Sequence, residues 1–313
     1  MRLTVQKARR LEQVARLYYE ENKNQHEIAA ALGVSRPLIS RMLQEARDAG
    51  IVSIRIIPHG EQESPVLIAA KERFGLAGGR LTPFQADNAK LNESIAHAVM
   101  DCIDQLGGGR VGLGWGHIIG AMVRIMEKRP PARSSISHVV PMVGNSGISI
   151  RNYHSNENVR IVAHHAMATP QYLHTPAFAE TAEELELWRK TENYKAVSRE
   201  WNRLDIALVN IGNHPSTPDF ASHARYGDLL SRRQAVGRMI AYYYTRNGEI
   251  IVSDTDYAVQ IPCASLSRSR HVVGVCSANI NRQTLEGALN TGLFTHVVAC
   301  ENLMQEVMDA VQS

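Results

Sequence analysis

The chain has 313 residues, which is enough for one large domain and one small domain. A hydrophobic fraction of 44% and a charged fraction of 21% are ordinary for a soluble globular protein, so intrinsic disorder is not expected. No stretch approaches the ~20 apolar residues that cross a bilayer, and no apolar segment follows the basic start as in a secretory signal. The net charge is only +3, but residues 1–60 hold ten Lys/Arg against six Asp/Glu, which favours a nucleic-acid contact there.

The N-terminal part is predicted to consist of three helices. Apolar residues at helical spacing predict a first helix over residues 8–21 and a short second helix over 25–32. Gly33 stops the second helix, and Ser35 opens the third, which continues to Gly50. Two helices joined by so tight a turn have the spacing of a helix-turn-helix.

The pattern changes twice after this module. Residues 51–57 alternate with a period of about two, which predicts a β-ribbon or wing, and residues 58–66 are polar with two prolines, as in a linker. From residue 67 to 313, apolar runs alternate with helical segments. The clearest runs are 110–114, 138–144, 206–212, 271–276 and 296–300. Most end in a small residue before a helix, which predicts an α/β fold with a Rossmann-like, mostly parallel sheet and ligand loops at the carboxyl ends of its strands.

The third helix is the expected recognition helix, because its polar positions can enter the major groove of DNA. A phosphate could bind at the N-terminus of the preceding helix. The residues expected to contact DNA are Gln25, His26, Ser35, Arg36, Ser40 and Arg41, with Gln44 at the margin. The alternative is a helical hairpin that only packs against the rest of the protein. The turn, the cap, the apolar spacing and the local charge together favour DNA binding.

Blocks along the whole chain resemble the SorC family of sugar-metabolism regulators. Near the N-terminus the blocks are residues 18–20, 25–29, 32–36, 39–43 and 45–52. The later blocks are residues 111–116 (VGLGWG), 140–144 (VPMVG), 176–177, 205–212, 234–237 (QAVG), 247–248 and 287–289. Because they follow one another in order, the resemblance covers essentially the whole chain.

The resemblance implies a cytoplasmic repressor or activator, usually tetrameric, that binds operator DNA. It also implies an effector domain similar to sugar-phosphate isomerases of the glucosamine phosphate isomerase type, without catalysis. The expected effector is a sugar, a sugar phosphate or a related small molecule. The resemblance further places sugar-binding amide side chains at Asn156 and Asn158.

The ends of successive strands supply the expected effector pocket, since glycines there let backbone amides approach a ligand closely. The residues expected to bind the effector are Gly114, Trp115, Gly116, His117, Gly144, Asn145, Ser146, Gly147, Asn156, Asn158, Gly212, Arg238, Asn281 and Arg282. For any single glycine the alternative is a tight strand-to-helix turn without a ligand. As a set at successive strand ends, they favour a pocket.

Some positions depart from the pattern of the family. Arg238 and Thr245 stand where the resemblance implies acidic residues, and Asn281 stands where it implies a lysine. Basic or hydroxyl residues usually follow the Gly-Trp-Gly block, and His117 begins that segment here. We therefore expect Arg238 and Arg282 to face the cleft and to favour a more acidic ligand. A changed binding mode, loss of effector binding, or surface ion pairs for the two arginines are the alternatives.

No cofactor or metal is expected. The four cysteines form no C-x-x-C pair and fit a reducing cytoplasm. Histidines cluster at His154, His164, His165 and His174, but no H-x-x-x-H pair with a nearby carboxylate lies on a clear helix, so polar or pocket roles are favoured.

Three classes of function fit this organisation. A metabolite-responsive DNA-binding regulator uses every predicted part. An enzyme of the sugar-phosphate isomerase or CoA-transferase type needs a paired general acid and base, which Arg238 and Thr245 do not supply. An interaction scaffold with a vestigial DNA module would not need Arg36, Ser40 and Arg41. The sequence favours the regulator, and the small size of its DNA module predicts a homo-oligomer, a dimer or tetramer.

Overall fold

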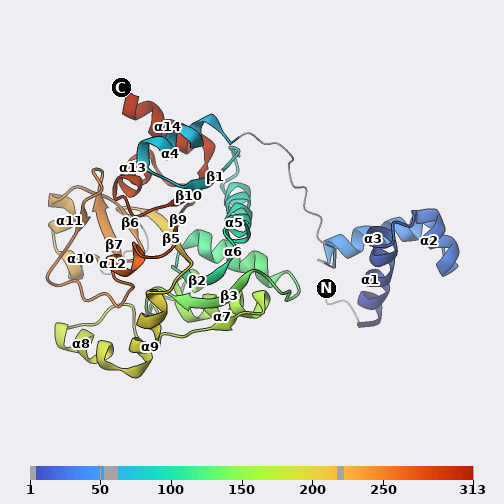
Figure 1. The fold of residues 1–313 in the computed structure, drawn as a ribbon, viewed down its shortest axis with the longest axis horizontal. Coiled ribbons are helices and arrows are strands. Elements are labelled where there is room, and N and C mark those ends of the chain that lie inside the picture. The colour runs from blue at the N-terminus through green and yellow to red at the C-terminus, as the bar shows by residue number, and fades with distance from the viewer. Residues whose placement is uncertain (1–4, 50, 53–62, 217–221, 313) are drawn as a thin grey trace. The chain divides into compact units, whose positions relative to one another are not determined.

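Figure 1 shows the computed structural model of the chain, which describes residues 5–49, 51–52, 63–216 and 222–312. These residues form two compact units, a smaller one before residue 63 and a larger one that begins at Glu63. No helix among the described residues is long and apolar enough to span a membrane.

The smaller unit contains three helices: α1 (Val5–Tyr19), α2 (Gln25–Leu32) and α3 (Arg36–Asp48). The bounds of α2 match the sequence prediction because both ends carry strong local signals. The Asn24 side chain caps the helix by accepting hydrogen bonds from the N–H groups of His26 and Glu27, each at 3.0 Å. Gly33 ends it with a left-handed φ of 64°, which glycine adopts without the strain that a Cβ would impose.

Apolar side chains from all three helices pack into one small core. The buried members are Leu11, Val14, Ala15, Ile28, Ala29, Ile39, Met42, Leu43 and Ala46. Because this packing uses the apolar face of α3, the polar face of that helix remains exposed. The core therefore fixes which side chains of α3 can meet a partner.

The segment after α3 was predicted to form a wing and then a linker. Most of the predicted wing, residues 53–57, lies outside the described residues, and Ile51 and Val52 are not in a strand. The linker was predicted to extend to residue 66, but helix α4 (Pro65–Phe74) already begins at Pro65. The prediction is wrong at that end because proline, read as a linker residue, occupies the first turn of a helix, where its missing N–H costs nothing.

The larger unit is built on a ten-stranded sheet. Its strands are β1 (Gly78–Thr82), β2 (Gly109–Leu113), β3 (Ile136–Pro141), β4 (Thr169–Pro170), β5 (Ile206–Asn213), β6 (Ala235–Met239), β7 (Tyr242–Thr245), β8 (Ile250–Ile251), β9 (His271–Cys276) and β10 (His296–Cys300). Seven strands run parallel in the order β1-β10-β9-β5-β2-β3-β4. The predicted α/β fold with a mostly parallel sheet is confirmed.

The direction in which the chain adds strands reverses between β2 and β5. From β2 the chain moves outward to β3 and β4, whereas from β5 it moves the other way, to β9 and β10. In an open α/β sheet, the crevice outside the carboxyl ends of two such strands is the usual ligand site. The topology therefore predicts that a ligand would bind beside the loops that follow Leu113 and Asn213.

An antiparallel hairpin that the sequence did not predict extends this sheet. Strand β6 pairs antiparallel with the end of β5, so that Gly212 lies opposite Arg238, and β7 and β8 continue the hairpin. Consecutive residues of a strand point to opposite faces. A Cβ added to Gly237 would meet Thr284 and Tyr244, whereas one added to Gly212 would lie 3.3 Å from Nε of Arg238. The Arg238 side chain therefore lies on the face of β6 opposite the helix that carries Thr284.

Helices cover the sheet. They are α4 (Pro65–Phe74), α5 (Asn88–Gln105), α6 (His117–Glu127), the 3-10 helix η1 (Arg151–Tyr153), α7 (Ser155–Ala166), α8 (Ala182–Lys190), α9 (Glu192–Trp201), α10 (Ser222–Tyr226), α11 (Leu229–Arg232), α12 (Cys263–Leu266), α13 (Arg282–Asn290) and α14 (Glu301–Gln312). Helices α4 and α13 both pack against α14, and the three lie together at the top of the domain in Figure 1. One extensive core joins most of these helices to the sheet, and a small separate cluster joins Tyr226 of α10 and Leu230 of α11 to Tyr243 and Ile251 of the hairpin.

Candidate DNA-binding face and effector site

The polar face of α3 exposes the side chains that the sequence predicted to contact DNA. Arg36, Ser40 and Arg41 are all exposed. Among the described residues, no carboxylate forms an ion pair with Arg36 or Arg41. Ser35 is the N-cap of α3 by backbone geometry, but its side chain makes no capping hydrogen bond, so its hydroxyl is not used by the helix. These groups are therefore available to DNA.

Arg36 lies beside the N-terminus of α2. A depression of about 490 Å³ is lined by Arg36 together with Tyr18, Asn24, Gln25 and His26. The structure thus brings together three residues that were predicted separately and adds Tyr18 from α1. A guanidinium and a helix N-terminus both attract a phosphate oxygen.

Arg41 belongs to a second depression, of about 250 Å³, that it lines with Lys7, Arg10, Leu11, Leu38, Met42 and Glu45. The sequence analysis did not single out Lys7 or Arg10. Their basic character and their helical spacing of three residues, which places them on one side of α1, are the signal that could have found them. Lys7 forms an ion pair with Glu45 at 2.8 Å.

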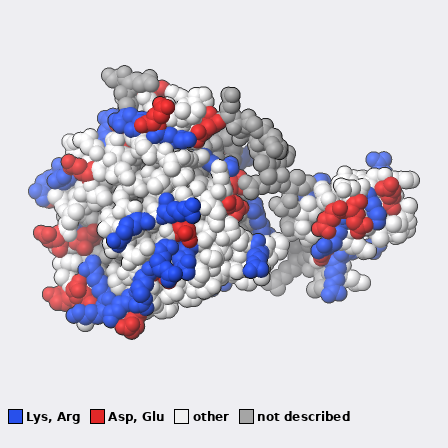
Figure 2. Space-filling model, in the orientation of Figure 1, with Lys and Arg blue, Asp and Glu red and all other residues white. Residues whose placement is uncertain are grey.

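Gln44 is the weakest member of the predicted set. Its Nε2 donates to Asp48 at 2.8 Å, and its Oε1 accepts from Arg47 at 2.7 Å. Figure 2 shows basic and acidic side chains intermixed on the visible face of the smaller unit. Because many charges on this surface compensate one another, specific cations such as Arg36 and Arg41 matter more than the net charge.

In the larger domain, the residues after β2 lie at the topological switch point. The Gly114 N–H donates to the carbonyl of Leu208 on β5 at 2.9 Å, and Gly116 has φ 118°. A Cβ on Gly116 would lie 2.7 Å from Cγ of Asn210, so glycine is needed for the loop to pass that close to β5. Trp115 is buried and donates from Nε1 to the carbonyl of Ile240 at 3.0 Å, which ties the loop to the hairpin.

A cluster of polar side chains gathers around the N-terminus of α6. His117, the first residue of the helix, is exposed, and its Nδ1 lies 3.4 Å from Nδ2 of Asn152. Arg124, two turns further along α6, donates from Nη1 to Oδ1 of Asn152 at 2.9 Å. Burial lowers the pKa of His117, and the positive charges of Arg124 and Arg238 lower it further. Arg124 and Arg238 thus both lie close enough to His117 for their charges to act on its ring.

Arg238 is buried, with 8% of its surface exposed, and its side chain reaches Tyr153. Burial raises the pKa of Tyr153, whereas Arg238 opposes that rise through its charge and a hydrogen bond to the phenol. The ring of Tyr153 also lies 5.9 Å from that of Trp115 and 6.2 Å from that of His117, between centroids. The structure thus brings together Trp115, His117 and Arg238 from the predicted effector set and adds Tyr153, Asn152 and Arg124.

Asn210 contributes a further polar group at this place. Its Nδ2 donates to the carbonyl of Ile211 at 3.2 Å. Its Oδ1 is buried and accepts no hydrogen bond from the residues that the structure describes. Asn210 and Gly212 are two residues apart on β5 and therefore face the same side of the sheet, which is the side on which Arg238 lies. No local pattern distinguished Asn210 within the apolar run 206–212.

Gly144, Asn145 and Asn156, at and near the loop after β3, all make contacts within the protein. Gly144 is buried, and a Cβ there would collide with the carbonyl of Pro176. Asn145 and Asn156 each donate to the carbonyl of Leu173 at 3.1 Å, and Oδ1 of Asn156 accepts from the Leu173 N–H at 3.0 Å. Their amide groups, which the sequence assigned to the effector, therefore hold this loop in place.

The remaining members of the predicted set near this loop differ in exposure. Ser146 is half-buried and Gly147 is exposed. Asn158 is 1% exposed and donates to the carbonyl of Asn152 at 3.1 Å, while its Oδ1 has no hydrogen-bond partner among the described residues. Asn158 therefore supports the backbone of the segment that carries Asn152 and Tyr153.

Asn281 and Arg282 lie at the start of α13. Asn281 is the N-cap of that helix, and its Oδ1 accepts from the Thr284 N–H at 2.9 Å. Arg282 lines a separate depression with Glu306, Asp309 and Ala310 of α14. Because α13 lies on the other face of β6 from the Arg238 side chain, the structure does not bring the two arginines together as expected.

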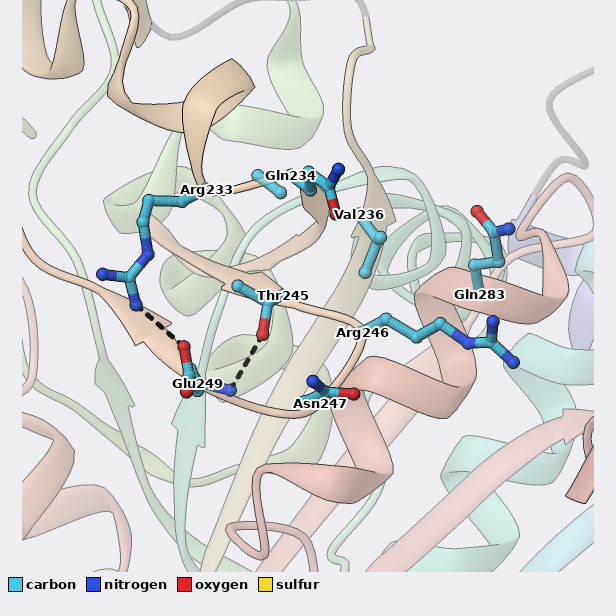
Figure 3. Close-up of a pocket in the computed structure, with 9 residues that line it drawn as sticks. Arg233, Gln234, Val236, Thr245, Arg246, Asn247, Glu249 and Gln283 are labelled. Carbon is cyan, nitrogen blue, oxygen red and sulfur yellow. Dashed lines mark hydrogen bonds and ion pairs between the residues drawn. The ribbon is translucent and has the colours of Figure 1, made fainter.

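Thr245, the other position where an acid was implied, lines a fourth depression, of about 550 Å³. Figure 3 shows its hydroxyl beside Glu249, which pairs with Arg233 at 2.8 Å. The Glu249 N–H donates to Oγ1 of Thr245 at 3.2 Å. Arg238, Tyr153 and His117 do not line this depression. The two substituted acidic positions thus belong to different surfaces.

Comparison with known proteins accounts for this combination of units. Residues 68–309 match a family described as a sugar-binding domain. The sorbitol operon regulator of Klebsiella pneumoniae is 28% identical over 288 residues, covering 88% of this chain and 90% of that protein. The deoxyribonucleoside regulator of Bacillus subtilis (strain 168) is 25% identical over 299 residues, covering 91% and 92%.

Solved structures show the same fold. The crystal structure of the full-length sorbitol operon regulator SorC from Klebsiella pneumoniae superposes with a TM-score of 0.72 at 26% identity, covering 96% of this chain and 99% of that one. A probable sor operon regulator from Shigella flexneri, at 22% identity, covers 78% of this chain and 98% of its own with a TM-score of 0.68. The chain belongs to the sugar-binding-domain family, and its membership of the SorC regulators, which the motifs indicated, is confirmed.

Proposed function

We propose that this chain is a DNA-binding transcriptional regulator of a carbohydrate catabolic operon, controlled by a sugar, a sugar phosphate or a related small molecule. Residues 1–57 bind operator DNA in this proposal. The domain that begins at about residue 63 binds the effector and mediates assembly into a homo-oligomer. The observation that carries the proposal is a recognition helix with exposed Arg36, Ser40 and Arg41 on a chain that also contains a sugar-binding-family domain.

The finer parts of the proposal rest on physical arguments. A single helix-turn-helix buries too little surface for tight specific binding, which favours a dimer or tetramer that spans two half-sites. The protein is proposed to be cytoplasmic, where its operator DNA lies, and not to be an enzyme. Arg238 and Thr245 cannot provide the paired general acid and base that sugar-phosphate isomerisation requires.

Substitution of the two exposed arginines of α3 tests the DNA assignment. Each of Arg36→Ala and Arg41→Ala should cost about 1–3 kcal/mol of binding free energy if the arginine contacts a base edge, because a bidentate pair is lost. Fluorescence anisotropy with a labelled duplex from the protein's own promoter measures this loss.

Arg16→Ala is the matched control. Arg16 is also exposed, but it pairs with Glu12 at 3.0 Å and Glu20 at 3.1 Å along α1, so its removal should leave operator affinity unchanged. An Arg36→Ala/Arg41→Ala double variant with the affinity of the unaltered protein would show that α3 is not the DNA-reading helix.

A further inference from the structure

Arginine side chains gather where helix α9 leads into strand β5. Arg110 of β2 and Arg203 both pair with Glu200, at 3.0 Å and 3.7 Å. Arg268 donates from Nη2 to Oδ1 of Asn202, in the same turn, at 2.8 Å. Figure 2 shows basic side chains gathered over α9 on the visible face of the larger domain. The name basic edge is used below for Arg110, Arg199, Arg203, Arg268 and Arg270.

The basic edge carries more positive charge than the carboxylates beside it neutralise. Glu200 is shared between two arginines, and Asp205 accepts a backbone N–H at 2.8 Å. Arg199, Arg268 and Arg270 are exposed, and no carboxylate among the described residues forms an ion pair with them. All five arginines lie near the amino ends of β2, β5 and β9, away from the crevice at the carboxyl ends of the strands. This surface therefore favours an acidic partner other than the effector.

Helix α8 presents the opposite charge on its outer face. Glu183, Glu186 and Leu187 are spaced by three and four residues, so they lie on one side of the helix. Leu187 is 65% exposed, although it is a large apolar residue. The basic residues Arg189 and Lys190 lie in the last turn, and Arg189 pairs with Glu186 at 2.7 Å. An exposed pair of this kind is weak enough to be exchanged for a contact with another molecule.

The two surfaces are neighbours on one chain. Helix α8 packs against α9, and Figure 1 shows the two helices side by side at the bottom of the larger domain. A second copy of the chain therefore carries the complement of both surfaces. Around a two-fold axis, each surface of one copy meets the other surface of its partner, so that two equivalent contacts form at once.

We propose that the outer face of α8 docks on the basic edge of a second copy of this chain, with reciprocal contacts around a two-fold axis. Glu183 and Glu186 of one copy pair with arginines of the other. Leu187 packs against the aliphatic stems of those arginines and supplies the apolar contact that ion pairs alone do not. The inference rests on the proposed function in one respect, the assembly into a homo-oligomer.

Two charge-reversed variants of the full chain test the interface. One is Arg199→Glu/Arg270→Glu, and the other is Glu183→Arg/Glu186→Arg. Each variant alone sets like charges against each other in both contacts, so sedimentation velocity at about 0.1 M salt should show self-association weakened tenfold or more. An equal mixture of the two variants restores opposite charges in both contacts and should assemble as the unaltered chain does.

Two further variants separate the interface from general effects of charge and folding. Leu187→Ala should weaken the assembly without any change of charge, and it keeps the test valid if a charge reversal lowers the melting temperature. Arg232→Glu alters an exposed arginine of α11 that pairs with Asp228, and it should leave the assembly unchanged. Assembly that neither reversal weakens, or that the mixture does not restore, would overturn the proposal.

Failure of this inference differs from failure of the proposed function. A chain that assembles and binds its promoter duplex in both reversed variants would keep the regulator and remove this interface. A chain that assembles through this interface but binds no promoter DNA would do the reverse. An unaltered chain that stays monomeric at micromolar concentration would remove both the interface and the proposed homo-oligomer.

Discussion

The two units of this chain present their candidate binding residues in opposite ways. On α3, Arg36 and Arg41 project into solvent, and the residues around them are folded by local signals such as the cap at Asn24 and the turn at Gly33. In the larger domain, Arg238 and Asn210 approach one another only because β5 pairs with a distant hairpin. Binding residues on an isolated helix follow from helical periodicity, whereas those in a crevice follow from tertiary structure.

The units also differ in the size of their cores. In the described part of the smaller unit, nine apolar residues are buried, whereas the described part of the larger domain has one extensive core and a small separate cluster of Tyr226, Leu230, Tyr243 and Ile251. A small core supplies only a few kcal/mol of net stability, so each large side chain in it matters more. The predictions below test this contrast.

The largest expected effect is at Ile39, which is fully buried between α3 and the other two helices. Ile39→Ala should cost about 2–5 kcal/mol, which is comparable with the whole stability of so small a unit. Operator binding should be lost, while the thermal transition of the larger domain should remain in place. Calorimetry together with anisotropy measures both, and Leu38→Ala, at a half-buried neighbour, should have a smaller effect. A common shift of every transition would argue against independent units.

An intermediate effect is expected at Asn156, which distinguishes a structural amide from a ligand-binding one. Asn156→Ala leaves the N–H of the buried Leu173 without its acceptor, although the Leu173 carbonyl keeps the donor of Asn145. The free energy of unfolding should fall by about 1–3 kcal/mol in urea denaturation. Asn156→Asp retains the acceptor for the Leu173 N–H but loses the donor to the Leu173 carbonyl, so it should also lower the stability. If Asn156→Ala left the stability unchanged but abolished effector binding, the Asn156 amide would have a ligand-binding role and not a structural one.

The smallest effect is a dependence on pH in the larger domain. Burial, together with the charges of the neighbouring His271 and Lys71, lowers the pKa of His296 to about 4. Since the unfolded chain protonates near pH 6.5, it binds more protons than the folded state below that pH. His296 therefore contributes stability above about pH 6.5 that is lost as the pH falls toward 4.

The pH prediction is measured as a difference between two proteins. His296→Gln should remove about 1–2 kcal/mol of the decline in unfolding free energy between pH 6.5 and 4. Urea denaturation across this range isolates the contribution of His296, because the carboxylates titrate in both proteins. Parallel pH profiles would contradict it.

The sequence predicted most of what local chemistry determines. It placed α2 at residues 25–32 and found β9 and β10 as runs 271–276 and 296–300, because caps, a C-terminal glycine and continuous apolar runs are visible locally. It also singled out Arg238 from its position in the family pattern; the structure buries this residue beside Tyr153, and its role in effector binding stays a prediction.

The rest depended on contacts between distant residues. The assignment of Asn156 to a ligand stays a prediction, but its hydrogen bonds to the backbone of Leu173, which the loop geometry reveals, could not be predicted from the sequence. Arg282 was expected beside Arg238, but antiparallel pairing of β6 with β5 places Gly237, not Arg238, on the side of α13. Asn210 was missed because nothing within an apolar run shows that one amide oxygen will face a crevice.

The attachment of the β6–β8 hairpin has a consequence for how such regulators diversify. Among the described residues, β6 pairs with the sheet at Ile211, Gly212 and Asn213 at the end of β5, and of these three Ile211 alone also pairs with a parallel strand, at Cys276 of β9. An exchange at Arg238 can therefore change the lining of this region while the register of the parallel sheet stays as it is. Met239 and Tyr244 of the same hairpin are buried in the main core, so variation that leaves the scaffold intact is confined to single positions such as Arg238.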